Sequence, residues 1–350
     1  MSRSPIATGV LLAVVAAIAF GVTTPVVAWA GRDLGPLSTA ALLYAGAAVA
    51  ALGLRLTTRR RGPALRRGDA SRLIAVALCG AAIAPSLLAW GLQRAGPTAG
   101  ALLLNLEAVF TVLLARALHR EPIGGRVAVA VVAMAAGGAA LTLDAIDAAT
   151  WGVGGALAVA GATLAWALDN TLTRPLAERE PIDVVAAKAT LGALVTGAAA
   201  LAWGEPAPGA TAALALLGAG ATGYGLSLRA YLLAQRRIGA GRTGSVFALA
   251  PFVGAALAWA LGDRGAGAGT LAAVGLFGLG VYLHVTERHA HPHVHAPVEH
   301  DHVHRHDDGH HDHVHVPPVV GEHAHPHRHD LLVHAHPHAP DLHHDHAHPG

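Results

Sequence analysis

The sequence predicts an all-α integral membrane protein with ten transmembrane helices, arranged as two inverted five-helix repeats and followed by a disordered tail. Hydrophobic residues make up 53% of the 350 residues, and charged residues only 13%, about half the share of a soluble domain. The apolar segments are long, continuous, and lack the apolar–polar alternation of a membrane barrel. The C-terminal segment is instead rich in histidine.

The apolar run from Thr98 to Arg116 is close to the length that a helix needs to cross a hydrocarbon layer of ~30 Å at ~1.5 Å per residue. The single cysteine, Cys79, excludes an internal disulfide. We place the ten spans at residues 6–29, 36–54, 73–92, 98–118, 127–143, 151–172, 184–203, 211–234, 243–261 and 270–285.

The distribution of arginine predicts the orientation, because cytoplasmic loops carry an excess of Lys and Arg. The loop between the second and third spans contains Arg55, Arg59, Arg60, Arg61, Arg66, Arg67 and Arg72. Counting loops from there, the predicted outer loops contain only Arg32, Arg94 and Arg264. Tryptophans typical of an interfacial belt lie at or near the outer ends, at Trp29, Trp90, Trp151, Trp203 and Trp259. We therefore expect a multi-pass protein of the inner (plasma) membrane with both termini in the cytoplasm.

The chain also contains an internal repeat. The sequence AFGVTT at residues 19–24 resembles AWALDN at 165–170, and residues 99–109 resemble 243–253 at nearly the same offset. Five spans per copy is an odd number, so the second copy enters the membrane from the opposite side, and transporters of this design bind substrate between the copies. The predicted units are a first repeat at 1–146, a second repeat at 147–286, and a metal-binding tail at 287–350.

The fourth span and the residues after it read LLLNLEAVFTVLLARALHREP. Together with the 5+5 arrangement, this resembles the EamA-type branch of the drug/metabolite transporter superfamily, whose fourth helix typically has a Leu-Glu-Pro-Val-like motif and a later Glu. Glu107 and Glu121 match that pattern, whereas Ala108 replaces the usual Pro. The second copy retains Pro251 without a Glu and has Asp263 in the place of the second acid. The resemblance implies a carrier fold without implying a particular solute.

Asn105 and Glu107 lie near the middle of the fourth span. A carboxylate at membrane depth costs at least ~2.5 kcal/mol on insertion scales, so it is expected to face protein or water. Glu107 either titrates with proton movement or contacts a cationic group of the substrate, or it is a buried structural carboxyl that bonds a neighbouring helix.

Three further polar residues flank the loop between the sixth and seventh spans: Asp169, Asn170 and Lys188. Asp169 and Lys188 are equidistant from the centre of that loop, so an antiparallel hairpin places them at the same depth. The pair is either a structural salt bridge or a substrate-linked pair that opens during transport. Thr24, which precedes Pro25, and Tyr224 in the eighth span are further candidates to line a cavity.

The tail contains 23 of the 25 histidines, mostly in His-x-His strings interrupted by Pro and Gly. In an extended chain alternate residues share a face, and imidazole binds zinc, nickel or cobalt. The alternative is an accidental low-complexity tail. The predicted metal ligands are His289, His291, His293, His295, His300, His302, His304, His306, His310, His311, His313, His315, His323, His325, His327 and His329.

Two functions remain open from the sequence. The favoured one is a secondary carrier of a small organic metabolite or drug-like solute, with a tail that binds transition metal. The alternative is a zinc, nickel or cobalt transporter, or a metal-responsive membrane protein, that collects or senses the ion with its tail. Because no nucleophile–base set, phosphate loop or dinucleotide motif is visible, we expect no enzyme activity and no required cofactor. We also expect no nucleic-acid partner. The protein is expected to be a monomer or a homodimer.

Overall fold

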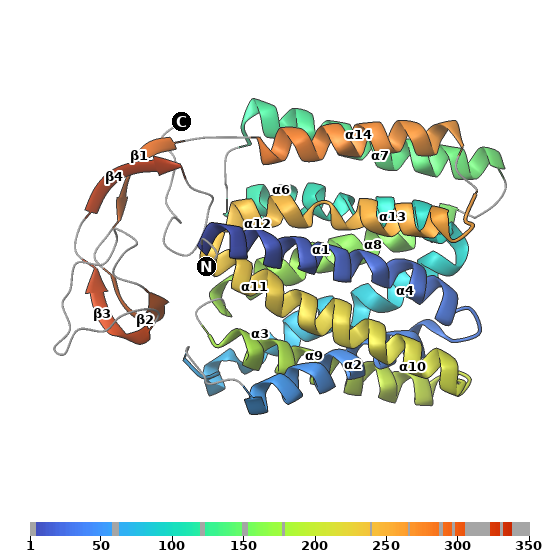
Figure 1. Cartoon of the computed structure of the whole chain (residues 1–350), viewed down its shortest axis with the longest axis horizontal. Helices are drawn as coiled ribbons and strands as arrows, with labels where there is room; N and C mark the ends of the chain where they lie inside the picture. Colours follow the sequence, from blue (N-terminus) through green and yellow to red (C-terminus); the bar gives the residue numbers. More distant parts are fainter. Residues whose placement is uncertain are drawn as a thin grey trace.

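The computed structural model describes a body of helices and, within the tail, four short strands. Figure 1 shows that α1 begins and α14 ends at the same end of the body, as expected for an even number of passes. The described residues are 5–57, 63–119, 123–148, 153–176, 179–238, 240–264, 267–286, 290–295, 298–304, 323–329 and 332–337.

The first half of the chain contains the helices from α1 to α7. They are α1 (Pro5–Ala30), α2 (Pro36–Thr57), η1 (Arg67–Asp69), α3 (Ala70–Ala77), η2 (Leu78–Ile83), α4 (Ala84–Ala95), α5 (Pro97–Leu103), α6 (Leu106–His119) and α7 (Gly125–Ala148). The second half contains α8 (Val153–Thr173), η3 (Arg174–Leu176), α9 (Pro181–Ala202), α10 (Ala210–Ala219), η4 (Gly220–Leu226), α11 (Ser227–Ile238), α12 (Ala240–Phe247), α13 (Ala250–Ala260) and α14 (Ala268–Val285).

A multi-pass membrane body is confirmed, whereas the number of ten spans stays a prediction. Two shorter apolar helices cover Ala250–Ala260 and Ala268–Leu283, and α8 is not among the candidate spans. Within the described residues, seven segments are long and apolar enough to cross a membrane: Ala7–Ala30, Pro36–Thr57, Arg67–Ala95, Pro97–Leu118, Gly125–Leu143, Pro181–Ala202 and Ala210–Gln235.

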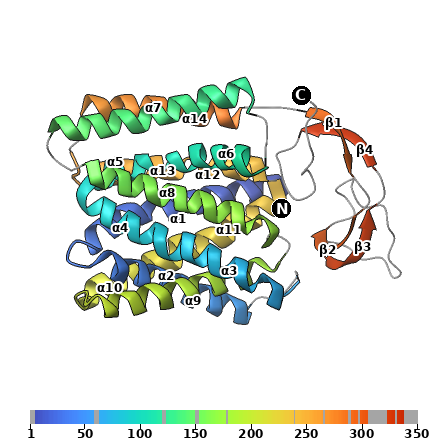
Figure 2. The ribbon, with the colours of Figure 1, turned by 180° about the vertical axis from the view of Figure 1, so that it is seen from behind.

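The packing of the helices follows the internal repeat. α7 packs on α14 along one edge of the body, and α2 packs on α9 along the opposite edge (Figures 1 and 2). Between these edges, α1 packs on α11 and α13, and α8 packs on α4 and α6. Each of these contacts joins equivalent helices of the two copies or has its counterpart in the other copy. The central helices are therefore α1 and α8, one from each copy.

Two spans contain π-helical turns at equivalent places, η2 in the third span and η4 in the eighth. The N–H of Ala84 donates to the carbonyl of Cys79, and the N–H of Ser227 donates to that of Thr222, which is the wide spacing of a π-helix. Pro85 lies in the first turn of α4 and has no N–H, so it cannot supply the usual donor to the carbonyl four residues earlier.

The fourth and ninth spans are interrupted at equivalent places, between α5 and α6 and between α12 and α13. At the first interruption the Asn105 side chain donates to the Leu102 carbonyl over 2.9 Å. In this arrangement the side-chain amide of asparagine competes with backbone N–H groups for a carbonyl of the helix. At the second, Pro251 lies in the first turn of α13, where a helix tolerates a missing N–H. Interrupted spans of this kind form the substrate sites of many inverted-repeat transporters.

The outer surface of the body is apolar. Val49, Leu214 and Leu271 lie within apolar helices and are each at least 70% exposed. Exposed aliphatic side chains on this scale require a hydrocarbon environment rather than water. The buried interior contains Leu43, Leu88 and many alanines, so neighbouring helices approach closely.

Four strands lie in the tail: β1 (Ala290–His295), β2 (Val298–His304), β3 (His323–His329) and β4 (Leu332–Pro337). They form two antiparallel pairs, β1 with β4 and β2 with β3. The prediction of a disordered tail is therefore wrong for these strands. Proline and glycine in the segment indicated an irregular chain, but the alternation of the His-x-His strings also suits extended strands.

Close approach of helices requires glycine at particular positions, and Gly220 allows this requirement to be tested. A Cβ at Gly220 would overlap the Leu43 backbone of α2, whereas a Cβ at Gly218, two residues earlier, has nothing within 4 Å. We expect Gly220→Ala to destabilise the protein by about 1–3 kcal/mol through overpacking. Gly218→Ala is expected to be neutral or stabilising, because alanine favours a helix.

Thermal unfolding of the two variants in detergent, followed by circular dichroism, measures this difference. Equal midpoints for Gly220→Ala and Gly218→Ala would contradict the close packing of η4 on α2.

Candidate functional site

Glu107 lies in the first turn of α6, directly after the interruption of the fourth span. Its Oε1 accepts a hydrogen bond from Nδ2 of Asn170 in α8 over 2.7 Å, and the Glu107 side chain is half-buried. A carboxylate in the first turn of a helix is also favoured by the helix dipole. This membrane-depth carboxylate is thus hydrogen-bonded by a neutral amide from the other copy.

Asp169 and Lys188 form an ion pair between Oδ2 and Nζ, with side chains 4% and 14% exposed. This agrees with the depth predicted from the hairpin of α8 and α9. The hydroxyl of Thr173 donates to the other oxygen of Asp169 over 3.3 Å. Gly80 of η2 lies against the carboxylate, and a Cβ there would overlap it. The absence of a side chain at Gly80 is what leaves space for the pair.

The two pairs form one group, which we name the polar cluster: Glu107, Asn170, Asp169 and Lys188. Asp169 and Asn170 are adjacent in α8, and Glu107 lies within electrostatic range of both Asp169 and Lys188. The cluster contains two carboxylates and one ammonium group. With every group ionised, its formal charge is therefore negative, and the charge not matched within an ion pair belongs to Glu107.

Six aromatic side chains from six different elements gather beside the polar cluster. We name them the aromatic cluster: Phe20, Tyr44, Trp166, Tyr224, Tyr231 and Phe247. Phe20 contacts three of the other rings, with its ring centroid 6.3 Å from that of Trp166, 5.6 Å from Tyr224 and 5.4 Å from Phe247. Tyr44 lies 5.4 Å from Tyr224, and Tyr231 lies 5.0 Å from Phe247.

This cluster is notable in a chain with only 6 Trp, 4 Tyr and 5 Phe. Its three tyrosines, Tyr44, Tyr224 and Tyr231, all lie within electrostatic range of Glu107. Tyr44, Trp166 and Tyr224 are buried, whereas Phe20, Tyr231 and Phe247 are half-buried. Aromatic surface and a carboxylate therefore meet at one place, with residues from both copies.

The polar and aromatic clusters are connected through η2. The Gly80 carbonyl accepts hydrogen bonds from the Tyr44 hydroxyl at 2.5 Å and from the Trp166 indole N–H at 3.0 Å. The Tyr224 hydroxyl is buried and has no partner of good geometry among the described residues, although the Thr23 side chain lies beside it. A buried hydroxyl of this kind can bond a ligand.

The remaining predicted residues have other positions. Asn105 is buried, and its amide bonds its own span at the interruption rather than the polar cluster. Thr24 is buried beside Pro25 in α1. Tyr224 joins the aromatic cluster, and a substrate-binding role for any of these residues stays a prediction.

Sequence reasoning missed five members of the aromatic cluster: Phe20, Tyr44, Trp166, Tyr231 and Phe247. One signal was available, because the internal repeat places Phe20 and Trp166 at equivalent positions in AFGVTT and AWALDN. The structure packs these two rings edge to face at 73°. We find no comparable signal for Tyr44 or Tyr231.

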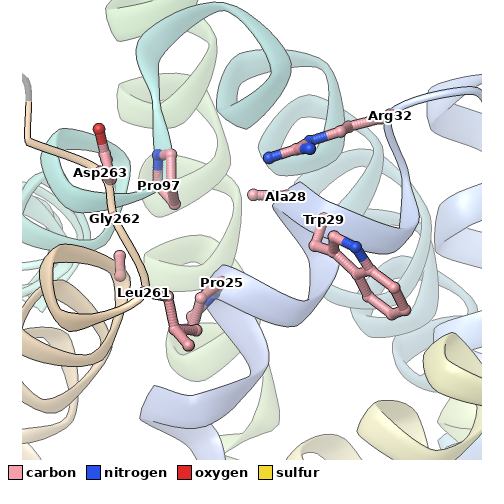
Figure 3. Close-up of a pocket in the computed structure, with 9 residues that line it drawn as sticks. Pro25, Ala28, Trp29, Arg32, Pro97, Leu261, Gly262 and Asp263 are labelled. Carbon is pink, nitrogen blue, oxygen red and sulfur yellow. The ribbon is translucent and has the colours of Figure 1, made fainter.

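A separate cavity of about 600 Å³ lies at the end of the body that contains Trp29, which we name the Trp29 end. Figure 3 shows it between the ends of α1 and α13 and the start of α5, with Arg32 and Asp263 on opposite sides. Pro25 lines this cavity, and Phe20 lies about 7–8 Å from it along α1, toward the start of the helix. The helix α1 thus runs from the cavity to the aromatic cluster.

Polar contacts join the two copies at both ends of the body. At the Trp29 end, the Asp263 carboxylate accepts from the N–H of Thr98, and the Glu205 carboxylate accepts from the N–H groups of Leu37 and Ser38. At the opposite end, which we name the Arg55 end, ion pairs join Arg55 to Asp183 over 3.0 Å and Arg179 to Asp69 over 2.8 Å.

The predicted metal ligands of the tail fall into two groups. His289, His306, His310, His311, His313 and His315 lie outside the described residues. The other ten lie in the strands β1, β2 and β3: His291, His293, His295, His300, His302, His304, His323, His325, His327 and His329.

Comparison with known proteins gives one family and one fold. The sequence matches the EamA-like transporter family twice, over residues 7–143 and 153–286. No curated protein matches the chain. A solved structure titled "Crystal structure of protein" is 20% identical, with a TM-score of 0.58, over 81% of this chain and 99% of that one. At this identity the likeness shows the fold alone.

Proposed function

Because the chain belongs to the EamA-like transporter family, whose members are membrane transporters of small solutes, we propose that it moves a small organic metabolite or drug-like solute by alternating access. The observation that carries the proposal is the meeting of the polar and aromatic clusters where interrupted spans of both copies pack together. We further propose that its His-rich tail binds zinc, nickel or cobalt.

Glu107 supports binding or coupling at this place. Keeping a carboxylate at membrane depth is costly, and the hydrogen bond that Glu107 accepts comes from a neutral amide rather than from a cation. A proton or a cationic group of the solute can therefore compete with Asn170 for the carboxylate. Asp169 is already paired with Lys188, so it is the less accessible of the two acids.

The aromatic cluster supports an organic solute rather than a metal ion. Aromatic faces provide apolar contact area and attract organic cations, but they do not ligate zinc, nickel or cobalt. Among the described residues of the helical body, no group of three or more His, Cys, Asp and Glu side chains could hold a metal ion. The metal transporter remains the second candidate because Cys79 lies within electrostatic range of Asp169 and Lys188.

The contacts at the two ends support alternating access. Polar contacts join the two copies at each end of the body, the ion pairs at the Arg55 end and the carboxylate–backbone bonds at the Trp29 end. Contacts of this kind break and form at modest cost as one copy rocks against the other. We propose that the Arg55 end faces the cytoplasm of an inner (plasma) membrane, in agreement with the arginine distribution.

Glu107→Gln tests the role of the carboxylate. The substitution keeps the shape and the hydrogen bonding of the side chain but removes its charge. We expect at least a tenfold loss of uptake, because a hydrogen bond to a charged group contributes about 1.5–3 kcal/mol. The measurement is uptake into proteoliposomes screened with a panel of labelled organic amines, amino acids and neutral metabolites.

The matched control is Asp33→Asn, which removes the same charge from an exposed residue outside the clusters. It should leave both uptake and thermal stability unchanged. If Glu107→Gln transports as well as the parent, or unfolds before it can be assayed, Glu107 is a structural residue.

Asp169 and Lys188 are tested by a double-mutant cycle with Asp169→Asn and Lys188→Met. Removing one partner of a buried pair destabilises a protein by about 3–5 kcal/mol, because a charge remains buried without its partner. We therefore expect each single variant to unfold at a lower temperature than the double variant. Uptake by the double variant then separates the two roles of the pair.

If stability and uptake both return in the double variant, the pair is structural. If stability returns without uptake, the opening of the pair belongs to the transport cycle. Additive losses of stability would contradict the pairing itself.

The tail is tested by zinc binding to the full-length protein. Imidazole has an ordinary pKa of about 6.5 and binds metal only when neutral, so bound zinc should be released as the pH falls through that value. Truncation after Arg288 should abolish this binding without lowering the unfolding midpoint of the helices. If the truncation also abolishes uptake of an organic solute, the metal transporter becomes the better proposal.

A further inference from the structure

The two sheets of the tail follow a single register. The pairing of β1 with β4 ends at His295↔Leu332. The pairing of β2 with β3 begins at Val298↔His329, three residues after His295 and three residues before Leu332. The strands β1 and β2 are therefore aligned with β4 and β3 as the two arms of one antiparallel hairpin.

This register places histidine opposite histidine in five rungs. In β1 and β4 the rungs are His291↔His336 and His293↔His334. In β2 and β3 they are His300↔His327, His302↔His325 and His304↔His323. Because alternate residues of a strand share a face, the rungs of each sheet lie on the same face.

The other face carries a different set of rungs. It pairs Glu299 with Arg328, Val303 with Ala324, and Val294 with Val333. Opposite charges and apolar pairs stabilise directly opposed positions of an antiparallel sheet. A slip of one residue would move every side chain to the other face and separate the histidine rungs. The chemistry of both faces thus favours the same register.

We propose that each sheet of the tail binds a divalent transition-metal ion, such as zinc, nickel or cobalt, through the four imidazoles of two neighbouring histidine rungs. The proposal rests on the proposed binding of metal by the tail and adds which histidines act together. Opposed residues have Cβ atoms about 4.5–5.5 Å apart, and neighbouring rungs of one face are roughly 7 Å apart.

Those spacings suit a site whose metal–nitrogen distances are about 2.0–2.1 Å and whose four ligands are tetrahedral. The site differs from a local His-x-His chelate in one respect. Each ion joins two segments that are distant in the sequence, so binding closes the hairpin. Metal then acts as a cross-link between β1 and β4, or between β2 and β3, whereas a local chelate would bind within one His-x-His string.

The register is tested with nitroxide spin labels at four positions of the non-histidine face. In a Cys79→Ser background of the full-length protein, single cysteines are introduced for labelling at Val294, Val303, Ala324 and Val333. The in-register pairs are 303 with 324 and 294 with 333. The same four positions recombine into the out-of-register pairs 303 with 333 and 294 with 324, which differ from the others only in their pairing.

With zinc chloride added, we expect strong dipolar broadening for both in-register pairs and weak broadening for both recombined pairs. Chelation of zinc should remove the difference. Equal broadening in all four pairs while zinc is bound would overturn the register and leave the simpler proposal of a metal-binding tail intact. No zinc binding at neutral pH would overturn both.

The ligands are tested by removing one complete rung. His302→Ala with His325→Ala removes the central rung of β2 and β3. His343→Ala with His344→Ala removes the same number of imidazoles from the tail at positions that belong to none of the proposed sites. We expect the rung variant to lose one bound zinc ion, or to bind it at least tenfold more weakly, in competition with a chromophoric chelator. An equal loss in both variants would contradict the four-imidazole sites.

Discussion

Every backbone carbonyl within a bilayer needs a hydrogen-bond donor from the protein, and this constraint governs the centre of the body. In η2 the carbonyl of Gly80 accepts from Tyr44 in the first copy and from Trp166 in the second. The same glycine leaves the space that the Asp169 carboxylate occupies. One π-helical turn thus holds an aromatic ring from each copy and positions the buried ion pair. Replacing the turn by a regular helix would disturb the ion pair and both aromatic contacts together.

The scaffold is symmetric, but its chemistry is not. Both copies contain a π-helical turn and an interrupted span at equivalent places. The acid of the fourth span, Glu107, has no counterpart before Pro251 in the ninth, and the repeat aligns Asp169 and Asn170 with Thr23 and Thr24. A symmetric scaffold allows two exchangeable arrangements of similar energy, one open at each end. An asymmetric site gives the solute one preferred orientation in both arrangements.

The parts of the fold that sequence reasoning predicted depend on local patterns. Apolar length indicated the spans, and the odd number of spans per repeat indicated the inverted copies. The Asp169–Lys188 pair was predictable because a hairpin joins its two helices. The hydrogen bond between Asn170 and Glu107 joins residues that are 63 positions apart in the sequence. No periodicity in either segment indicates that the two helices meet.

The aromatic cluster was missed for the same reason, since each of its elements contributes one ring. The strands of the tail were missed for a different reason. Proline and glycine were weighed within each His-x-His string, whereas the regular feature is the match between two strings far apart in the chain. The pairing of β2 with β3 becomes visible only when both arms are aligned.

The pairing of the tail strands has a thermodynamic consequence. An isolated two-stranded hairpin is marginally stable in water, and closing the long connection between β2 and β3 costs additional chain entropy. Imidazoles on one face add little apolar burial to offset that cost. A metal ion that binds only the paired strands stabilises them by about 2.7 kcal/mol when its concentration is 100 times its dissociation constant. The order of such a tail therefore follows the concentration of the ion. This dependence is the property of a sensor, whereas a buffer requires only that the ion be held.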